Sequence, residues 1–167
     1  ADVYKFLNYF TFLPVEQIQQ IEREDAERQG RPQAQAVLAE EVTRLVHGED
    51  GLTAAKRITE ALFSGDTSSL SEQDYEQLAL DGLPSSALSG SNLAETPLTT
   101  LLSDAGLAPG GKQVKDALQR NAVVVNGQSY GVDDNMRAAE IFTQEAARFG
   151  KYFLVKLGKK KHHLFTL

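Results

Sequence analysis

The sequence contains no cysteine, which excludes disulfide bonds and metal sites built on thiolates. It has no run of about 18 apolar residues, so we expect no membrane-spanning helix and no membrane partner. The opening stretch ADVYKFLNYF has neither a basic leader nor a small-residue cleavage pattern, so it is not a secretory signal. It lacks an initiator Met and begins within an amphipathic pattern. From this beginning we expect a piece of a longer chain, and from the absence of cysteine we expect a cytoplasmic protein.

Charge is distributed unevenly along the 167 residues. The net charge is −6, which taken globally argues against a nucleic-acid partner. Residues 1–82 carry 7 Lys/Arg against 16 Asp/Glu, a net of −9, whereas residues 97–167 carry 10 against 6, a net of +4. This asymmetry predicts two modules with different partners.

The first half has helical periodicity throughout. The hydrophobic spacing predicts helices over residues 2–13, 14–30, 31–48, 48–65 and 71–82. Several of these segments end at glycine, as at Gly30, Gly48 and Gly65. Ser71 with Asp74 three residues later resembles a capping box. Residues 1–82 are therefore predicted to form an all-α helical bundle.

The pattern changes after a stretch rich in Ser, Ala and Gly. Residues 83–96 have no periodicity, which predicts a linker. Beyond it, helices are expected over 97–107, 112–121 and 138–150, and strands within 122–132 and 151–167. Asn-Gly at 126–127 predicts a hairpin turn. The predicted fold class is α+β, with a small α+β domain over 97–167.

No residues in the sequence form a convincing catalytic or metal-binding set. His162 and His163 are adjacent on a predicted strand and should point to opposite faces, which disfavours a shared metal ion. His47 stands near a predicted helix end, where a charge–dipole or capping role suffices. The segment GLAPGGK lacks the final Ser/Thr of a phosphate-binding loop. The acidic clusters at 22–27 and 40–41 are interpreted as solvated helix faces. We expect no catalytic residue, cofactor or metal in this chain.

Basic side chains form the stronger signal. Lys112 and Lys115 lie three residues apart and should project from one side of a helix whose other side is apolar. A lone helix of this kind is most simply a surface helix with solubilising lysines. A second basic cluster in the same module shifts the interpretation toward a polyanion such as RNA. The candidate RNA-binding residues are Lys112, Lys115, Arg120, Asn121, Lys156, Lys159, Lys160 and Lys161.

Residues 106–128, GLAPGGKQVKDALQRNAVVVNGQ, resemble the small RNA-binding fold named after a ribosomal small-subunit protein. The stretches YKFLNYFTFLP, AVLAEEVTRLVHGEDGLTAAKRITEALFSG and LSEQDYEQLALDG resemble the helical anticodon-binding region of bacterial tyrosyl-tRNA synthetases. The resemblance covers almost the whole chain in the family's order. It implies a helical anticodon-binding region over 1–82, a linker over 83–96 and an RNA-binding domain over 97–167.

The resemblance also implies a function. It implies contacts with the anticodon stem and long variable arm of tRNA-Tyr, within a homodimeric parent that attaches tyrosine using ATP and Mg. The family's His-Ile-Gly-His-type and Lys-Met-Ser-Lys-Ser-type signatures do not occur here. We therefore expect a monomeric fragment that cannot activate tyrosine. Related sequences have Ser-Arg or Ser-Lys where this chain has Gly110 and Gly111, which shifts or weakens the phosphate contact expected there.

Two other classes of function stay open on the sequence. One is a protein-interaction module that uses the acidic helices as its docking surface. The other is a complete RNA-modifying enzyme, which the missing catalytic constellation disfavours. Binding of tRNA-Tyr would separate the leading hypothesis from the protein-interaction module.

Overall fold

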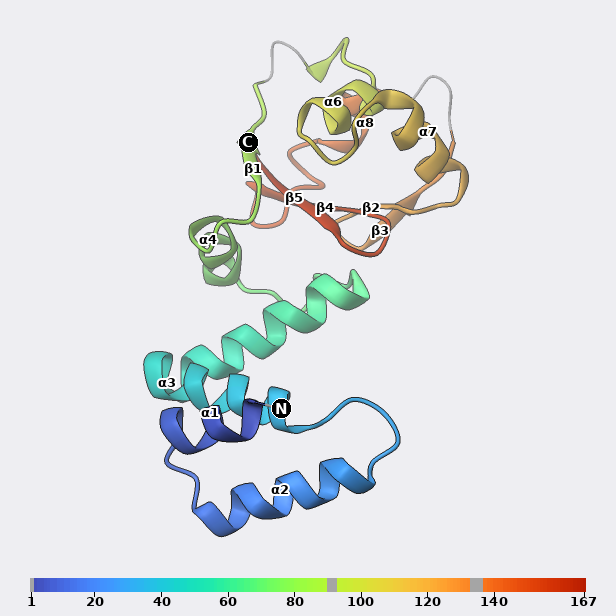
Figure 1. Ribbon diagram of the computed structural model, residues 1–167. Helices are drawn as coiled ribbons and strands as arrows, with labels where there is room; N and C mark the ends of the chain where they lie inside the picture. The colour runs from blue at the N-terminus through green and yellow to red at the C-terminus, as the bar shows by residue number, and fades with distance from the viewer. Residues whose placement is uncertain (1, 90–92, 133–136) are drawn as a thin grey trace. The chain divides into compact units, whose positions relative to one another are not determined.

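The computed structural model describes residues 2–89, 93–132 and 137–167 (Figure 1). The chain divides into two units, Ala1–Lys56 and Arg57–Leu167, and each is described by itself. Neither unit has a helix, among the residues described, that is long and apolar enough to cross a membrane.

The first unit is helical. It contains α1 (Val3–Phe10), α2 (Val15–Glu27) and the beginning of α3 (Ala34–Ser64). Its buried apolar cluster is small and comprises Leu7, Ile18, Ile21 and Ala34. Each helix places one apolar side in this cluster, as the spacing of the sequence predicts.

Asp25 ties the three helices of the first unit together. Its carboxylate accepts hydrogen bonds from the Tyr4 hydroxyl (3.1 Å) and from the backbone N–H groups of Gln33 (2.6 Å) and Ala34 (3.0 Å). Burial opposes ionisation, yet these hydrogen bonds hold the pKa of Asp25 below its ordinary value. The prediction that the whole 22–27 cluster is solvated is therefore wrong at Asp25, which is buried.

Helix α3 is interrupted at Gly48, as the sequence predicts. Gly48 has φ 73° and ψ −176°, and the helical segments on either side meet there at a kink. The positive φ suits glycine, which pays no steric cost there. Close to the kink, a Cβ placed on Gly51 would lie 2.5 Å from the Cβ of His47, so only glycine fits without rearrangement.

The second unit is built on a mixed sheet. Within the described residues the strands are β1 (Ser85–Ala87), β2 (Val123–Val125), β3 (Gln128–Tyr130), β4 (Tyr152–Leu157) and β5 (Lys161–Thr166), in the order β1-β5-β4-β2-β3. β1 pairs with β5 in parallel, and the other neighbouring pairs are antiparallel. Asn126 (φ 48°) and Gly127 (φ 88°) form the two-residue turn between β2 and β3, which confirms the predicted hairpin.

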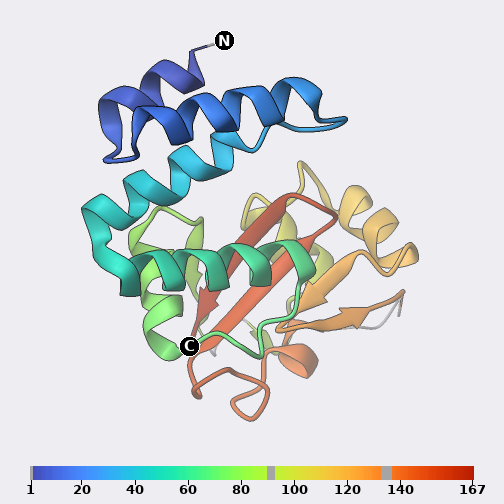
Figure 2. The same cartoon turned by 90° about the horizontal axis from the view of Figure 1, so that it is seen from below.

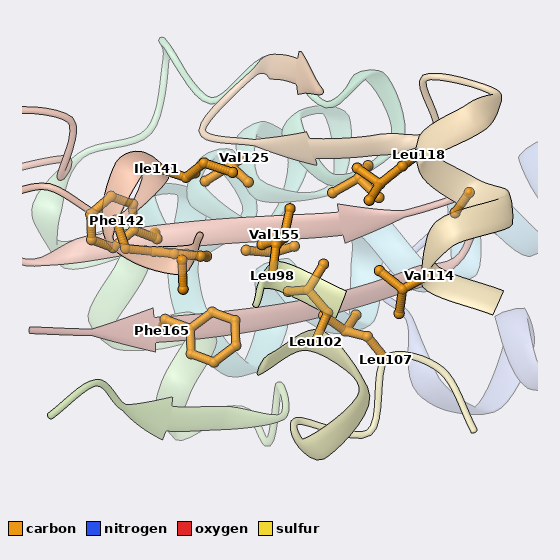
Figure 3. Close-up of a cluster of buried hydrophobic side chains, with 14 of the residues drawn as sticks. Leu98, Leu102, Leu107, Val114, Leu118, Val125, Ile141, Phe142, Val155 and Phe165 are labelled. Atoms are coloured by element: carbon orange, nitrogen blue, oxygen red, sulfur yellow. The ribbon is translucent and has the colours of Figure 1, made fainter. Parts of the chain in front are cut away.

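Both faces of the sheet are covered. The helices α6 (Leu98–Asp104), α7 (Gly111–Gln119) and α8 (Ala138–Ile141) lie on one face, and their leucines and valines pack on strand residues such as Val155 and Phe165 (Figure 3). The last turns of α3 and α4 (Glu72–Leu80) cover the other face (Figure 2). Successive residues of a strand point to opposite faces, so Tyr152 and Leu154 pack with Tyr75 beneath the sheet. The predicted α+β class is confirmed.

Helix α4 begins as the sequence predicts. The backbone N–H of Asp74 donates to the Ser71 hydroxyl, and the backbone N–H of Ser71 donates to the Asp74 carboxylate, which completes the capping box. The same carboxylate receives two hydrogen bonds from the Arg57 guanidinium, from Nε and from one terminal nitrogen, at 2.8 Å each. Arg57 of α3 is thereby fixed to the first turn of α4.

Three features differ from the sequence-based expectations. The helix expected over 138–150 is only Ala138–Ile141, because Ile141 and Phe142 enter the core and the chain then turns at Thr143. Part of the predicted linker forms β1, whose hydrogen bonds to β5 supply order that its composition does not indicate. The boundary between the two units lies between Lys56 and Arg57, not within 83–96, because α4 packs on the sheet.

Candidate nucleic-acid interface

Helix α7 separates its apolar and basic side chains onto opposite sides. Val114, Ala117 and Leu118 are buried against the sheet, whereas Lys112 and Lys115 are exposed. The sequence predicts this division from the spacing of three and four residues. Arg120 and Asn121 are exposed just beyond the last turn, where Arg120 Nε donates to the Asp116 carbonyl (3.1 Å).

No side chain caps the first turn of α7. Gly110 is the N-cap residue and offers no side chain to the first turn, and that turn contains no acidic residue. The first backbone N–H groups of a helix carry partial positive charge. Lys112 adds a full positive charge beside them. This end of α7 is therefore electropositive, although Gly110 and Gly111 contribute no side-chain donor.

The turn between β4 and β5 brings the second basic cluster next to α7. The backbone N–H of Gly158, at the start of this turn, donates to the carbonyl of Ala122 (2.7 Å), just after the end of α7. Lys159, Lys160 and Lys161 follow and are exposed. The end of α7 and the lysine turn thus lie side by side. We call this set the basic surface: Lys112, Lys115, Arg120, Asn121, Lys159, Lys160 and Lys161.

Most lysines of the basic surface are not neutralised by a carboxylate. Within residues 2–89, 93–132 and 137–167, no ion pair is found for Lys112, Lys159, Lys160 or Lys161. The ion pairs of the described residues occur instead on α1, α3 and α4. The charge of the lysines is thus available to an anion.

Lys156 has a different environment from the other predicted contacts. It points to the face of the sheet that α3 covers, and its ammonium donates to the carbonyl of Phe63 (2.6 Å) at the end of that helix. His162, its partner across β4 and β5, donates from Nε2 to the neighbouring carbonyl of Leu62 (2.9 Å). The two side chains thus satisfy carbonyl groups that the end of α3 leaves unpaired.

The two neighbouring histidines point to opposite faces, as the sequence predicts. His163 is buried, packs on Phe165 and shares a 2.6 Å hydrogen bond between its Nε2 and the Ser86 hydroxyl of β1. Burial lowers the pKa of both histidines, and the charge of Lys156 lowers the pKa of His162 further. In the part of the chain that the structure describes, no group of three or more His, Asp or Glu side chains is placed to hold a metal ion.

Two features of this region are not indicated by the sequence. One is the Ser86–His163 hydrogen bond, because β1 lies in the segment predicted to be a linker. The other is a pocket beside the lysine turn. Segments that are distant in the sequence form its walls. The alternation of His163 and Phe165 does indicate one inward-facing histidine, but no local pattern identifies its partner.

The first unit carries an apolar groove. Residues of α1, of the segment after it and of α3 line a groove of about 630 Å³. Large hydrophobic side chains are exposed there, including Tyr9 (75%), Phe12 (88%) and Val46 (65%). Monomeric proteins rarely leave a contiguous apolar patch of this kind uncovered. We call it the aromatic groove.

Two family models match the chain. Residues 74–165 match the model described as Tyrosine–tRNA ligase SYY-like C-terminal domain. Residues 1–64 match the model described as tRNA synthetases class I (W and Y). The first match contains the whole basic surface, and the second contains the aromatic groove.

Curated relatives agree with these matches. The chain is 48% identical over 165 residues to a tyrosine–tRNA ligase of Aliivibrio fischeri, covering 99% of this chain and 37% of that protein. It is 46% identical over 173 residues to a tyrosine–tRNA ligase of Neisseria meningitidis, covering 99% of this chain and 39% of that protein. The chain therefore spans less than two fifths of the length of these relatives.

Proposed function

The chain belongs to the tyrosine–tRNA ligase family as its C-terminal portion, and from that premise we propose that it binds tRNA-Tyr through the basic surface. The observation that carries the proposal is the 2.7 Å hydrogen bond from Gly158 to Ala122, which holds the lysine turn beside the end of α7. Two cationic elements held side by side on one folded unit suit recognition of folded RNA by phosphate contacts and shape.

The contact is expected at the anticodon stem and the long variable arm of the tRNA. Deleting the variable arm should therefore weaken binding more than changing the acceptor end. Lys156 is a predicted contact too, but its ammonium already donates to Phe63, so we expect a smaller contribution from it. Equal losses from the two tRNA changes would contradict this assignment.

The decisive experiment removes the charges of α7. The triple variant Lys112→Ala, Lys115→Ala, Arg120→Ala should bind tRNA-Tyr more weakly and with a shallower dependence on salt, because each neutralised phosphate releases counterions. Lys5→Ala is the matched control, since the Lys5 side chain is 71% exposed on α1 in the other unit. If the folded triple variant binds like the parent, in affinity and in salt slope, the proposal fails.

Catalysis is assigned to the rest of the ligase. We propose that the full ligase attaches tyrosine using ATP and Mg in the cytoplasm, as a homodimer, and that this chain alone is a monomer without tyrosine activation. Assaying tyrosine-dependent exchange between ATP and pyrophosphate tests this directly. Exchange catalysed by the purified chain would overturn the claim that it does not activate tyrosine. A dimer that persists at all concentrations in sedimentation would overturn the claim that it is a monomer.

The aromatic groove favours a second role, in protein contact. We infer that its occupant is the remainder of the tyrosine–tRNA ligase chain, rather than a partner of the acidic helices. The groove lies entirely within the segment that matches the class I synthetase model. The match covers only 37% and 39% of the two relatives, so most of each relative lies outside it. Apolar side chains of this size gain about 1.5–3 kcal/mol each when buried.

A chimera tests this second role. This chain replaces the matching segment of the Aliivibrio fischeri relative, and Phe12→Asp is introduced both there and in the isolated chain. The substitution should destabilise the chimera more than the isolated chain, where Phe12 is 88% exposed. Val15→Asp is the control, because Val15 is exposed but does not line the groove. Equal effects of Phe12→Asp in both backgrounds would contradict this role.

A further inference from the structure

The last turn of α3 leaves a large aromatic side chain in water. Phe63 is 78% exposed, whereas its neighbours Ala61 and Leu62 pack in the cluster beneath the sheet. A single exposed aromatic residue is common on protein surfaces and by itself indicates no site. The position of Phe63 relative to the basic surface is what gives its ring a role.

Two strand residues hold the backbone of Phe63 near the lysine turn. The ammonium of Lys156 donates to the carbonyl of Phe63 (2.6 Å), and His162 Nε2 donates to the carbonyl of Leu62 (2.9 Å). Lys156 and His162 are paired across β4 and β5, and only one further residue pair separates them from the turn. The end of α3 therefore lies next to the lysine turn.

The side chain of Phe63 lies on the side of α3 that faces away from α4. Ala61 is buried in one cluster with Tyr75 and Leu78 of α4, and two residues advance a helix by about 200°, so Phe63 is on nearly the opposite side. The ring of Tyr75 stacks on Tyr152 at the start of β4, whereas α3 crosses beneath the other end of that strand (Figure 2). The side of α3 away from α4 is therefore the side of the lysine turn.

The charges near Phe63 suit a neutral group at the ring and an anion at the turn. Glu60, one helical turn before Phe63, is exposed, so the surface of α3 itself does not favour a phosphate. Lys159 and Lys160 are exposed in the turn, and within the described part of the chain neither has an ion pair. An unpaired nucleotide has both parts, a flat base and a charged phosphate. Every base has a face that can stack on an aromatic ring.

We propose that Phe63 stacks against an unpaired base of the RNA whose neighbouring phosphates contact the lysine turn. This rests on the proposed function, since RNA must first reach the basic surface. Proteins bind unstacked bases of loops, bulges and ends on aromatic side chains. Such stacking accepts any base, so Phe63 adds affinity for a single-stranded segment beside a folded stem.

The first experiment measures binding of tRNA-Tyr to variants of the whole chain. Phe63→Ala should weaken binding at least about fivefold without changing the salt slope, because a stacking contact is lost and no phosphate contact. Phe63→Leu keeps an apolar side chain without a ring and should lose most of the same affinity, whereas Phe63→Trp should retain it.

Phe149→Ala is the matched control for these variants. Phe149 is also an exposed aromatic residue (53%), but it lies just before β4, at the end of that strand opposite the lysine turn. Its loss should leave tRNA affinity unchanged. Urea unfolding confirms that each variant is folded. Parental affinity in folded Phe63→Ala would refute the proposal, and parental affinity in Phe63→Leu would replace stacking by a general apolar contact.

The second experiment observes the ring directly and needs no tRNA. A fluorine is placed on the ring of Phe63 in the whole chain, which is titrated with a short single-stranded oligoadenylate and with inorganic polyphosphate. The oligoadenylate should shift the ¹⁹F resonance saturably, because a stacked base changes the magnetic environment of the ring. Polyphosphate carries charge but no base and should not. Equal shifts with the two ligands would overturn the proposal in favour of a simple anion effect.

The two experiments separate this proposal from the proposed function. If the parent chain does not bind tRNA-Tyr at all, the proposed function fails, while the oligoadenylate titration still reports on Phe63. If tRNA binding depends on Lys112, Lys115 and Arg120 but not on Phe63, the stacking contact fails and the basic surface stands. Destabilisation of the Aliivibrio fischeri chimera by Phe63→Ala, with tRNA affinity unchanged, would assign the ring to a protein contact instead.

Discussion

The two faces of the sheet are covered by helices of opposite character. Beneath the sheet, α4 and the end of α3 expose Glu60, Glu72 and Glu76. Above it, α7 exposes lysines, and the lysine turn extends the positive charge. Both covers bury apolar side chains on the same two central strands, β4 and β5. Both faces of the sheet are thus covered by packed helices, and what distinguishes them on the outside is the sign of their exposed charge.

Removing a core side chain should have the largest effect. Leu118→Ala on α7 should destabilise the fold by about 2–5 kcal/mol, because it leaves a cavity against the sheet. Gln119→Ala, at an exposed position of the same helix, should change stability by less than about 0.5 kcal/mol. Urea unfolding measures both. Similar values for the two would mean that α7 is not anchored through its apolar side.

On the acidic face, one carboxylate is structural and the others are not. Asp74→Ala should cost about 2–3 kcal/mol, since Arg57 loses its partner and α4 loses half of its capping box. Glu76→Ala, exposed on the same helix, should be nearly neutral. Chemical denaturation gives the free energy of unfolding of both variants. If Asp74→Ala did not lower it, the buried carboxylate would be no more structural than the exposed ones.

Acid should destabilise both faces. Burial lowers the pKa of His163 in the folded chain below 6.5, so its contribution to stability is present above that pH and is lost as the pH falls. Burial opposes ionisation of Asp74, but Arg57 and Ser71 lower the pKa of Asp74, and its contribution is lost at more acid pH. The free energy of unfolding should therefore decline from pH 7 to 5, less steeply in His163→Phe. An identical slope in that variant would show that His163 does not contribute.

A single surface charge should have the smallest effect. Lys112→Ala should reduce the salt slope of tRNA binding by about one unit or less and leave stability within about 0.5 kcal/mol of the parent. Lys5→Ala should change neither quantity. Isothermal titration at several salt concentrations gives the slopes, and equal slopes for the two variants would place Lys112 outside the contact.

Local patterns in the sequence predict most of the helices and the Asn-Gly hairpin. The spacing of Val114, Ala117 and Leu118 identifies the buried side of α7, and Ser71 with Asp74 identifies the start of α4. These features depend on residues a few positions apart. The location of the basic residues also follows from sequence, although their role as RNA contacts stays a prediction.

Features that depend on distant residues are not predictable in this way. β1 is a strand only because β5 supplies its hydrogen bonds. Lys156 stays a predicted RNA contact, but its sequence neighbours do not indicate that its ammonium donates to the carbonyl of Phe63, 93 residues away. In the sequence Asp25 is one of several neighbouring acidic residues, yet in the fold its carboxylate accepts a hydrogen bond from the hydroxyl of Tyr4, 21 residues away. Each case requires knowledge of which segments meet in the fold.

Asn126 also bears on how the protein ages. Asparagine followed by glycine is the sequence most prone to deamidation, in which the backbone nitrogen of the glycine attacks the side-chain carbonyl to form a succinimide. Here the Asn126 side chain donates to the carbonyls of Ala146 and Tyr152 and accepts from the N–H of Leu154. These bonds fix the amide and oppose the rotation that the attack requires. Loss of the amide should therefore proceed through the unfolded chain, and the chemical lifetime of the hairpin should follow the stability of the sheet.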